Sequence, residues 1–268
     1  MGVLNVTPDS FSDGGHYNRV PCALSRAKAM VAAGASILDI GGESTRPGFT
    51  EVSDEEEIHR VVPVIEALVA AHLPAILSVD TRKARVAKAA LTKGVHLIND
   101  VSTLRDPAMA EVLAEHNAAV ILMHSPPELT RDTSHEEAQA SGPVHGDCAG
   151  LHETLRQAIE KAETAGIPRS HILIDPGLGF GKTTEANLRL TYDLSALLSF
   201  HMPIVYGPSR KRFLGDIIGK ASDERDIATA AVCAIAALAG AHIFRVHNVA
   251  LARDALLVAD AVRHSAVG

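Results

Sequence analysis

Short apolar runs recur along the whole chain, and each is followed by a polar segment and then by a stretch with helical spacing. Several runs are rich in Val and Ile and show no alternation of polar and apolar positions, as is typical of parallel strands buried on both faces. The runs cover Met1–Val6, Ser36–Ile40, Ala75–Val79, His96–Ile98, Ala118–Met123, Ile172–Ile174, Pro203–Tyr206 and His242–Val246. This pattern predicts eight strands, each followed by a helix.

Local signals mark the ends of the predicted helices. Side chains that accept hydrogen bonds from a helix N-terminus precede the helical stretches at Ser53, Thr81 and Asp106. Glycines suited to the left-handed conformation of a helix C-terminus follow at Gly34, Gly94 and Gly166. Each strand-plus-helix unit therefore spans about 30 residues, the size of a βαβ repeat.

Eight consecutive units of this kind favour an α/β fold of the (β/α)8 TIM barrel type over a doubly wound sheet. No Pro/Gly-rich linker divides the chain, so we expect a single domain over residues 1–268. The longest break lies at about 124–148, a length that indicates a functional loop or an insertion. The chain opens directly on its first strand, from which we expect it to be a piece of something longer.

Composition narrows the class of protein. Hydrophobic residues make up 47% and charged residues 21% of the 268 residues, which suits a globular domain rather than a disordered chain. The formal charge of −7 and the scattered basic residues argue against nucleic acid as a partner. The three cysteines lack CxxC spacing, which argues against a zinc site and a disulfide framework. No apolar run reaches the roughly 18 residues of a membrane span, so we expect no membrane partner.

Polar side chains end nearly every predicted strand. In a barrel these ends meet at one rim, where such enzymes hold their active sites. A single polar residue there is explained equally well by helix capping, but the whole set favours an enzyme that binds a polar, heteroatom-rich substrate. The set comprises Asn5, Asp39, Asp80, Asn99, Asp100, His124, Asp175, Ser209, Arg210, Lys211, Arg245 and His247.

The charges in this set divide by the chemistry they suit. Asp80 and Asp175 can accept hydrogen bonds from a ring that carries N–H donors. Arg245, His247 and Lys211 suit an anion, and Arg46 in a preceding loop does too. The sequence therefore predicts a ligand with a donor-rich head and a phosphate tail.

A glycine-rich segment at Gly177–Thr183 has the look of a phosphate-binding P-loop. It fails that pattern because Pro176 stands at the position that requires the first glycine. We interpret the segment as a tight wall that lets a substrate approach the backbone. Two further loops, at Asn5–Gly15 and Gly41–Gly48, are small, polar and flanked by glycine, which is typical of loops that close over a substrate and also of plain surface turns.

The same segments resemble a known family. Residues 1–15, with the sequence MGVLNVTPDSFSDGG, closely resemble the opening signature of the dihydropteroate synthases, and residues 39–48, DIGGESTRPG, resemble the second. Two later stretches, GPSRKRF and RVHN, are more similar to the synthase domain of eukaryotic bifunctional folate enzymes. The match continues in order through Ser78–Thr81, Ile98–Asp100, Asp175–Gly177, Gly207–Lys211 and Arg245–His247.

The resemblance implies a transferase of folate biosynthesis. The family joins 6-hydroxymethyl-7,8-dihydropterin diphosphate to p-aminobenzoate by loss of diphosphate to give a pterin cation, which the arylamine then attacks. No nucleophilic side chain is needed, in agreement with the lack of any Ser–His or Cys–His motif. A carboxylate such as Asp80 can stabilise the developing cation, and Mg²⁺ the departing diphosphate.

Site roles follow from the family's motifs by position. The implied catalytic residues are Asp80, Lys211 and Arg245. The implied pterin-binding residues are Asp80, Asn99, Met123, Asp175 and Lys211. Arg245 and His247 would bind diphosphate together with Asn5, which would also carry the Mg²⁺. The implied p-aminobenzoate pocket, where sulfonamides also bind, comprises Asp9, Phe11, Thr45, Arg46, Pro47, Phe180 and Ser209.

The resemblance also implies partners and a compartment. Relatives with this barrel are commonly homodimers through their last helices, and the apolar stretches Ile227–Leu238 and Leu251–Val262 permit that arrangement. A pterin pyrophosphokinase domain fused upstream would suit the abrupt start. We expect a cytoplasmic enzyme, or a mitochondrial matrix enzyme if the chain comes from a plant-like bifunctional protein.

One departure and two alternatives remain at this point. After His124 the family usually has a short Met/Arg-x-Gly stretch, whereas Ser125-Pro126-Pro127 follows here, so the role of the fifth loop is open. A corrinoid-linked pterin methyltransferase shares the barrel and the Asp/Asn contacts, but it would lack the long opening loop. An inactive binding domain that kept the pocket is the second alternative.

Overall fold

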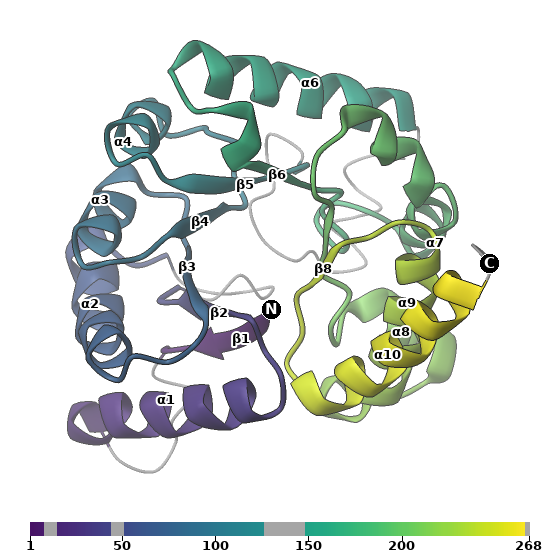
Figure 1. Cartoon of the computed structure of the whole chain (residues 1–268), viewed down its shortest axis with the longest axis horizontal. Coiled ribbons are helices and arrows are strands. Elements are labelled where there is room, and N and C mark those ends of the chain that lie inside the picture. The colour runs from purple at the N-terminus through teal and green to yellow at the C-terminus, as the bar shows by residue number, and fades with distance from the viewer. Residues whose placement is uncertain (8–14, 44–50, 126–147, 266–268) are drawn as a thin grey trace.

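The computed structural model describes residues 1–7, 15–43, 51–125 and 148–265 of the chain. Within these ranges, strands alternate with helices, and the helices form an outer ring around the strands (Figure 1). The strands are β1 Gly2–Asn5, β2 Ile37–Gly41, β3 Ile76–Asp80, β4 Leu97–Asp100, β5 Ala119–Met123, β6 Ile172–Asp175, β7 Val205–Tyr206 and β8 Ile243–Phe244. The helices are α1 Gly15–Ala32, α2 Asp54–Ala70, α3 Ala84–Thr92, α4 Met109–Glu115, α6 Cys148–Thr164, α7 Thr184–Tyr192, α8 Arg212–Ile218, α9 Asp226–Leu238 and α10 Val249–Ser265, with short 3-10 turns at Arg169–His171, Leu194–Phe200 and Ser222–Glu224.

All paired strands are parallel, and each lies beside the next along the chain. Strands β1 to β6 form one sheet in sequence order, and β7 pairs with β8. Bridges from Ile174 to Ile204 and from Gly2 to Val246 join the two groups, so the ring closes on itself. The predicted (β/α)8 barrel is therefore confirmed, although the last two predicted strands keep only two residues each of regular pairing.

The uninterrupted apolar runs are explained by burial of both faces of every strand. Successive side chains of a strand point to opposite faces. One set, including Leu38 and Ile98, belongs to the large core under the helices. The other set faces the barrel interior, where Ile37, Leu97 and Ile121 make a separate small apolar cluster with Val205.

The interior-facing set changes from apolar to polar along the strands. Two residues beyond Ile37 on β2 stands Asp39, and two beyond Leu97 on β4 stands Asn99. A period of two keeps these side chains on the same interior face. The amino-terminal half of the barrel is therefore dry, and polar groups gather at the carboxyl-terminal half.

Helix boundaries follow the sequence signals in part. Ser53 Oγ accepts a hydrogen bond from Glu56 N at 3.2 Å and caps α2 as predicted. Thr81 and Asp106 are not N-cap residues, because α3 begins after Lys83 and α4 after Ala108. Asp106 instead reaches back to the preceding helix and accepts a hydrogen bond from Ala84 N at 2.8 Å.

The helix C-termini behave as the glycines predict. The φ angles are +100° at Gly34, +98° at Gly94 and +95° at Gly166, a region that favours glycine because a side chain there is strained. Residues 126–147, which make up most of the predicted long loop at about 124–148, are not among the described residues. In the part of the chain that is described, no helix combines the length and apolarity that a membrane crossing requires.

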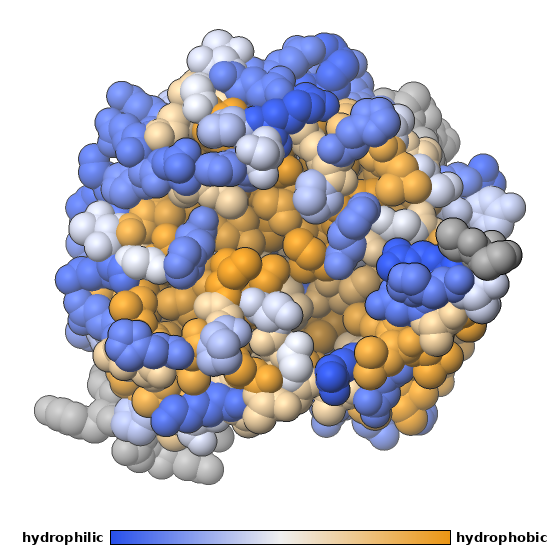
Figure 2. Space-filling model, viewed as in Figure 1, coloured by the Kyte–Doolittle hydropathy of each residue, from blue (hydrophilic) through white to orange (hydrophobic). Residues whose placement is uncertain are grey.

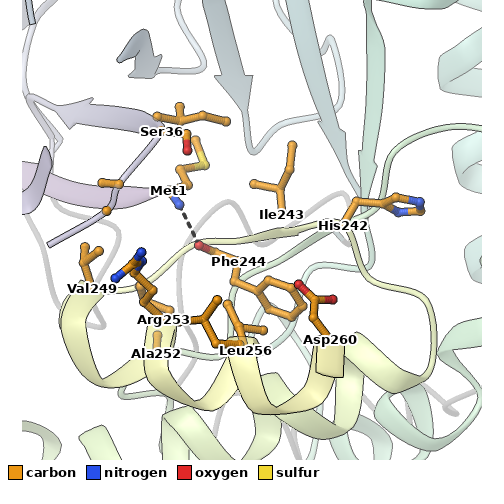
Figure 3. A pocket seen from close by; sticks show the side chains of 15 residues that line it. Met1, Ser36, His242, Ile243, Phe244, Val249, Ala252, Arg253, Leu256 and Asp260 are labelled. Carbon is orange, nitrogen blue, oxygen red and sulfur yellow. Dashed lines mark hydrogen bonds between the residues drawn. The ribbon is translucent and has the colours of Figure 1, made fainter. Parts of the chain in front are cut away.

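The amino-terminal end of the barrel holds a cavity of about 280 Å³ between the starts of the strands and α10 (Figure 3). Among the residues that line this cavity, the Met1 amine donates a hydrogen bond to the Phe244 carbonyl oxygen at 2.9 Å. Apolar side chains gather at the centre of the face seen in Figure 2, inside a rim of hydrophilic ones. Chemistry that needs charged groups is therefore expected at the opposite end.

We predict that Ile121→Ala lowers the free energy of unfolding by about 2–5 kcal/mol, because it opens a cavity in the fully buried barrel interior. Chemical denaturation monitored by circular dichroism measures the change. Leu188→Ala, on the outer surface of α7, serves as the control and should cost much less. Equal losses for the two variants would contradict the interior packing described above.

Candidate active site

Four strands contribute to one buried hydrogen-bonded cluster at the carboxyl-terminal half of the barrel. Asp39 on β2 has no solvent exposure and accepts a hydrogen bond from Ser78 Oγ on β3 at 2.6 Å. Its other oxygen accepts from Asn99 Nδ2 on β4 at 3.3 Å and from Arg245 Nε, just after β8, at 2.6 Å. Every oxygen of this buried carboxylate is thus satisfied by the protein.

Arg245 bridges two buried carboxylates from different strands. Its Nε contacts Asp39, and its Nη2 donates to Asp80 Oδ2 at 2.7 Å. The partners lie 206 and 165 residues away in the sequence, so only closure of the barrel brings them together. A single guanidinium therefore faces two carboxylates, and ionisation of both leaves one negative charge in excess within the buried cluster.

This crowding shifts the protonation of the groups involved. Burial raises the pKa of Asp80 to about 7, against the lowering effect of Arg245, and the nearby charge of Asp39 adds to the rise. Burial also lowers the pKa of Arg245, but Asp39 and Asp80 outweigh it and hold that pKa above its usual range. Asp80 therefore exchanges its proton near neutral pH while Arg245 stays charged.

Asp175 at the end of β6 joins the same group. A side chain on Gly207 would lie 3.8 Å from Arg245 Cβ and 3.9 Å from Asp175 Oδ2, so both meet at the end of β7. Asp175 Oδ1 accepts a hydrogen bond from Gly177 N at 2.6 Å. Burial raises the pKa of Asp175 to about 6, although that hydrogen bond and the charge of Lys211 lower it.

An apolar wall stands beside the carboxylates. Val101, Met123 and Phe180 form a small cluster of their own at this end of the barrel. The Lys211 ammonium lies 4.2 Å from the centroid of the Phe180 ring, a cation–π contact. A flat, donor-rich ring would find apolar surface on one side and hydrogen-bond acceptors at its edge.

The loops after β7 and β8 are tied together at the rim. Ser209 Oγ lies 2.9 Å from His247 Nδ1 and accepts a hydrogen bond from His247 N at 3.1 Å. Arg210 adopts a left-handed φ of +60° and makes a two-pronged ion pair with Asp226 at 2.8 and 2.9 Å. Arg210 thus holds the loop in place, and Lys211 is the cation of this loop that faces Phe180.

Asn5 is the residue whose chemistry fits a divalent cation. Its Oδ1 lies 3.3 Å from the point where a Gly41 side chain would begin, and Asp80 Cβ lies 3.9 Å from that point. A side chain on Gly41 would crowd this amide oxygen, which is a hard ligand of the kind that Mg²⁺ accepts. No group of three metal-ligating His, Cys, Asp or Glu side chains occurs within residues 1–7, 15–43, 51–125 and 148–265. One amide oxygen fits Mg²⁺ only as a single ligand of a set that a bound anion and water would have to complete.

The structure brings most of the predicted site residues together. One strand-end residue points elsewhere: the Asp100 carboxylate accepts hydrogen bonds from Ser102 N and Leu104 N, so it stabilises the turn after its own strand. Residues Asp9, Phe11, Thr45, Arg46 and Pro47 lie outside the described residues. Those found at the carboxyl-terminal end of the barrel are Asn5, Asp80, Asn99, Met123, Asp175, Phe180, Ser209, Lys211, Arg245 and His247.

Sequence reasoning assigned no role to three buried polar residues of the site. Asp39 belongs to the set of polar strand residues, and a carboxylate inside an apolar run is the sequence signal that indicates a buried functional acid. Ser78 gives no such signal, since a serine in a strand is common. Lys182 stands in the glycine-rich segment and is only 2% exposed, and no phosphate pattern predicts that burial.

Comparison with known proteins agrees with this arrangement. Residues 1–247 match the family model described as "Pterin binding enzyme". The dihydropteroate synthase of Escherichia coli (strain K12) is 41% identical over 97% of this chain and 90% of its own length. The mitochondrial folate synthesis bifunctional protein of Pisum sativum is also 41% identical, over 98% of this chain and 53% of its own length.

A solved structure supports the same relationship. The dihydropteroate synthase of Xanthomonas albilineans in complex with 7,8-dihydropteroate superposes with a TM-score of 0.84 at 40% identity, covering 98% of this chain and 92% of that one. The chain is 41% identical to the bacterial enzyme and 41% identical to the plant bifunctional protein. Sequence identity therefore does not support the predicted closer similarity to the eukaryotic proteins.

We predict that Asp80→Asn raises the melting temperature above that of the unchanged protein at pH 8 and by less at pH 5. The pKa of Asp80 is higher in the folded protein than in the unfolded chain, so folding favours the protonated carboxyl. The free energy of unfolding therefore falls as the pH rises towards and through about 7. Arg245 keeps Asp39 as its partner in the variant. Differential scanning fluorimetry across this pH range measures the effect, and Asp260→Asn on α10 is the surface control. A variant that melts lower than the unchanged protein at pH 8 would show that Asp80 stabilises the fold.

Proposed function

Because the chain belongs to the pterin-binding enzyme family, among the dihydropteroate synthases, we propose that it joins 6-hydroxymethyl-7,8-dihydropterin diphosphate to p-aminobenzoate. The products are 7,8-dihydropteroate and diphosphate, so the chain is a transferase of folate biosynthesis. The observation that carries the proposal is the buried bridge from Arg245 to Asp39 and Asp80. It gathers acceptors for a ring and a cation for an anionic leaving group within one site.

The pterin ring is held at its edge and on its face. Asp175 and Asn99 accept and donate hydrogen bonds along the ring edge, since a carboxylate takes ring N–H groups and an amide serves both kinds of partner. Met123 packs on the ring face, where it clusters with Phe180. Lys211 lies at the Phe180 ring, from which it reaches an acceptor atom of the pterin.

The leaving group is bound on the side of Arg245 and His247. Loss of diphosphate breaks the C–O bond, and both bonding electrons leave with the oxygen. The carbon left behind carries positive charge, which the ionised Asp80 stabilises in a dry site. Arg245, which stays protonated, and His247 hold the developing negative charge, while Asn5 would hold a Mg²⁺. That ion, when bound, neutralises further charge on the diphosphate.

The arylamine needs position more than activation. Ser209 and Phe180 form the described part of its pocket, and the family's motifs assign Asp9, Phe11, Thr45, Arg46 and Pro47 to the same pocket. The amine attacks the pterin carbon and loses one proton to solvent or to a nearby base. Holding two reactants in contact is itself a large contribution to rate.

A corrinoid-linked methyltransferase is the second candidate within the same family model. The curated relatives at 41–44% identity over most of the chain are named for synthase activity, and this favours the first. A synthase also needs Lys211 and Ser209 beside the apolar wall, for which methyl transfer has no use. A binding domain without turnover is the remaining alternative, and an activity assay separates all three.

We predict that the purified protein forms 7,8-dihydropteroate from the pterin diphosphate and p-aminobenzoate in the presence of Mg²⁺. Asp80→Ala and Lys211→Ala should each lower turnover at least about tenfold, the effect of losing one preorganised charge. The acid limb of the kcat/KM profile should fall between pH 6 and 7, where Asp175 and Asp80 take up protons. Product release followed by chromatography provides the measurement.

Near-normal kinetics in both variants would count against the proposed roles. Methyl transfer without dihydropteroate would favour the second candidate, and tight substrate binding without product would favour the third. Leu188→Ala on the outer surface of α7 is a matched surface control and should keep full turnover.

The partner we propose is a second copy of the same chain. Helices α9 and α10 pack together and leave an apolar surface exposed, visible at the lower right of Figure 2. Solvent contact with so much apolar area is unfavourable, so a matching surface stabilises it. The exposed side chains are Ile227, Ile235 and Leu238 on α9 and Leu251, Leu257, Val258 and Val262 on α10. We place the enzyme in the cytoplasm, or in the mitochondrial matrix if it is part of a plant-like bifunctional protein.

We predict that light scattering gives a mass near twice 28.2 kDa at micromolar concentration. Val258→Glu, a charge placed on the exposed side of α10, should yield the monomer with its fold intact by circular dichroism. If the unchanged protein is a monomer, or if the dimer persists in the Val258→Glu variant, the proposal that α10 forms the dimer interface is wrong.

A further inference from the structure

Lys182 is a buried lysine whose ammonium, among the described residues, binds backbone carbonyls and no side chain. Its side chain reaches back under the loop that follows β6, and the residue is 2% exposed. Nζ donates to Gly177 O at 2.7 Å, to Phe180 O at 3.1 Å and to His124 O at 3.4 Å. A lysine in a phosphate-binding loop points outward to its ligand, whereas this one points into its own loop.

Three acceptors match the three N–H groups of an ammonium and exceed the two of a neutral amine. Burial lowers the pKa of Lys182 to about 7, and the charge of Asp175 opposes that shift. The carbonyl geometry therefore favours the charged form in an environment that disfavours charge. Such a costly arrangement is retained where the charge contributes to a site.

The same loop touches the end of β5 in a way that only glycine permits. Gly177 has a φ of +69°, and a side chain there would begin 1.9 Å from the His124 carbonyl oxygen. The lysine completes this contact because it bonds the His124 and Gly177 carbonyls together. Loops from two neighbouring strands are thus joined by one ammonium.

This clamp connects to the pterin site at both ends. At one end, Gly177 N donates to Asp175 Oδ1 at 2.6 Å, and Lys182 Nζ lies 3.3 Å from the position of a Gly177 side chain. At the other, the Phe180 carbonyl accepts from Lys182 while its ring packs against the Lys211 ammonium. The position of Asp175, proposed to bind the pterin, and that of Phe180, proposed to line the adjoining p-aminobenzoate pocket, are therefore both set by the shape of one short loop.

We propose that Lys182 is a positioning residue for the pterin site: its ammonium clamps the Gly177–Phe180 loop to the end of β5 and places a positive charge behind Asp175. The inference rests on the proposed function, since the positions of Asp175 and Phe180 matter only if the pterin and p-aminobenzoate bind beside them. The residue acts through these neighbours and does not itself touch the substrate.

Three cations surround Asp175, each from a different element. Lys211 precedes α8, Arg245 follows β8, and Lys182 follows β6; all three lower the pKa that burial raises. His124 at the end of β5 stays neutral, because burial lowers its pKa to about 3. Removal of the Lys182 charge thus leaves Asp175 protonated at a higher pH, and a protonated carboxyl binds ring N–H groups poorly.

A comparison of Lys182→Met with Asn187→Ala distinguishes the effect of the Lys182 charge from the effect of the hydrogen bonds that hold the loop in place. Asn187 holds the same loop without a charge, since it accepts from Gly179 N at 2.8 Å and donates to Lys182 O at 3.3 Å. Calorimetry measures the Kd of the pterin diphosphate for the full chain from about pH 5.5 to about pH 8.5. The titration of the ligand itself is common to all variants and cancels in the comparison.

For Lys182→Met we expect a Kd at least about tenfold higher at neutral pH and an acid limb displaced upward by about one pH unit. Asn187→Ala should weaken binding with the acid limb unmoved. Lys182→Gln, which keeps two donors without charge, should show the same displacement and serves if the Met variant does not fold.

A Lys182→Met or Lys182→Gln protein that binds the pterin like the unchanged protein, or whose acid limb stays in place, would overturn the inference alone. An unchanged protein that neither binds the pterin nor forms product would overturn the proposed function and this inference with it.

Discussion

The bridge between Arg245 and the two buried carboxylates of Asp39 and Asp80 is the constraint on which the site depends. One guanidinium serves two buried acids, so loss of Arg245 would leave both carboxylates without their cation, whereas loss of the Asp80 charge leaves Arg245 paired with Asp39. The bridge needs β8 to lie within reach of β2 and β3, which only a closed barrel provides. Closure of the fold and assembly of the site are therefore the same event.

The barrel separates stability from chemistry by position along its axis. Interior residues at the strand starts, such as Ile37 and Leu97, are apolar and packed. Those two or more positions later are acids, amides and cations that shift each other's pKa. Burial would destabilise a single charge at this place. Here several charges of both signs are buried together, and burial shifts their pKa values while their attraction offsets part of its cost.

The loops at the rim are held by side chains that do not face the substrate. Arg210 pairs with Asp226, Asp106 caps the preceding helix from outside, and Lys182 binds three carbonyls. Each of these was open to a simpler interpretation in the sequence, as an anion-binding cation, a local cap or part of a phosphate loop. A motif names the residue types, whereas the direction of each side chain depends on contacts from other elements.

The sequence by itself determined the eight strands, the barrel and the polar strand ends, because uninterrupted apolar runs and the helical spacing between them are local properties of the chain. Its motifs also indicated the family that the comparisons support. Only the tertiary structure decided which polar ends serve the site: Asp100 turned to cap its own loop, while Asp39 and Lys182 became buried members of it. The physical reason is that hydrogen bonds and ion pairs between strands up to 206 residues apart are fixed by closure of the ring, which no local pattern encodes.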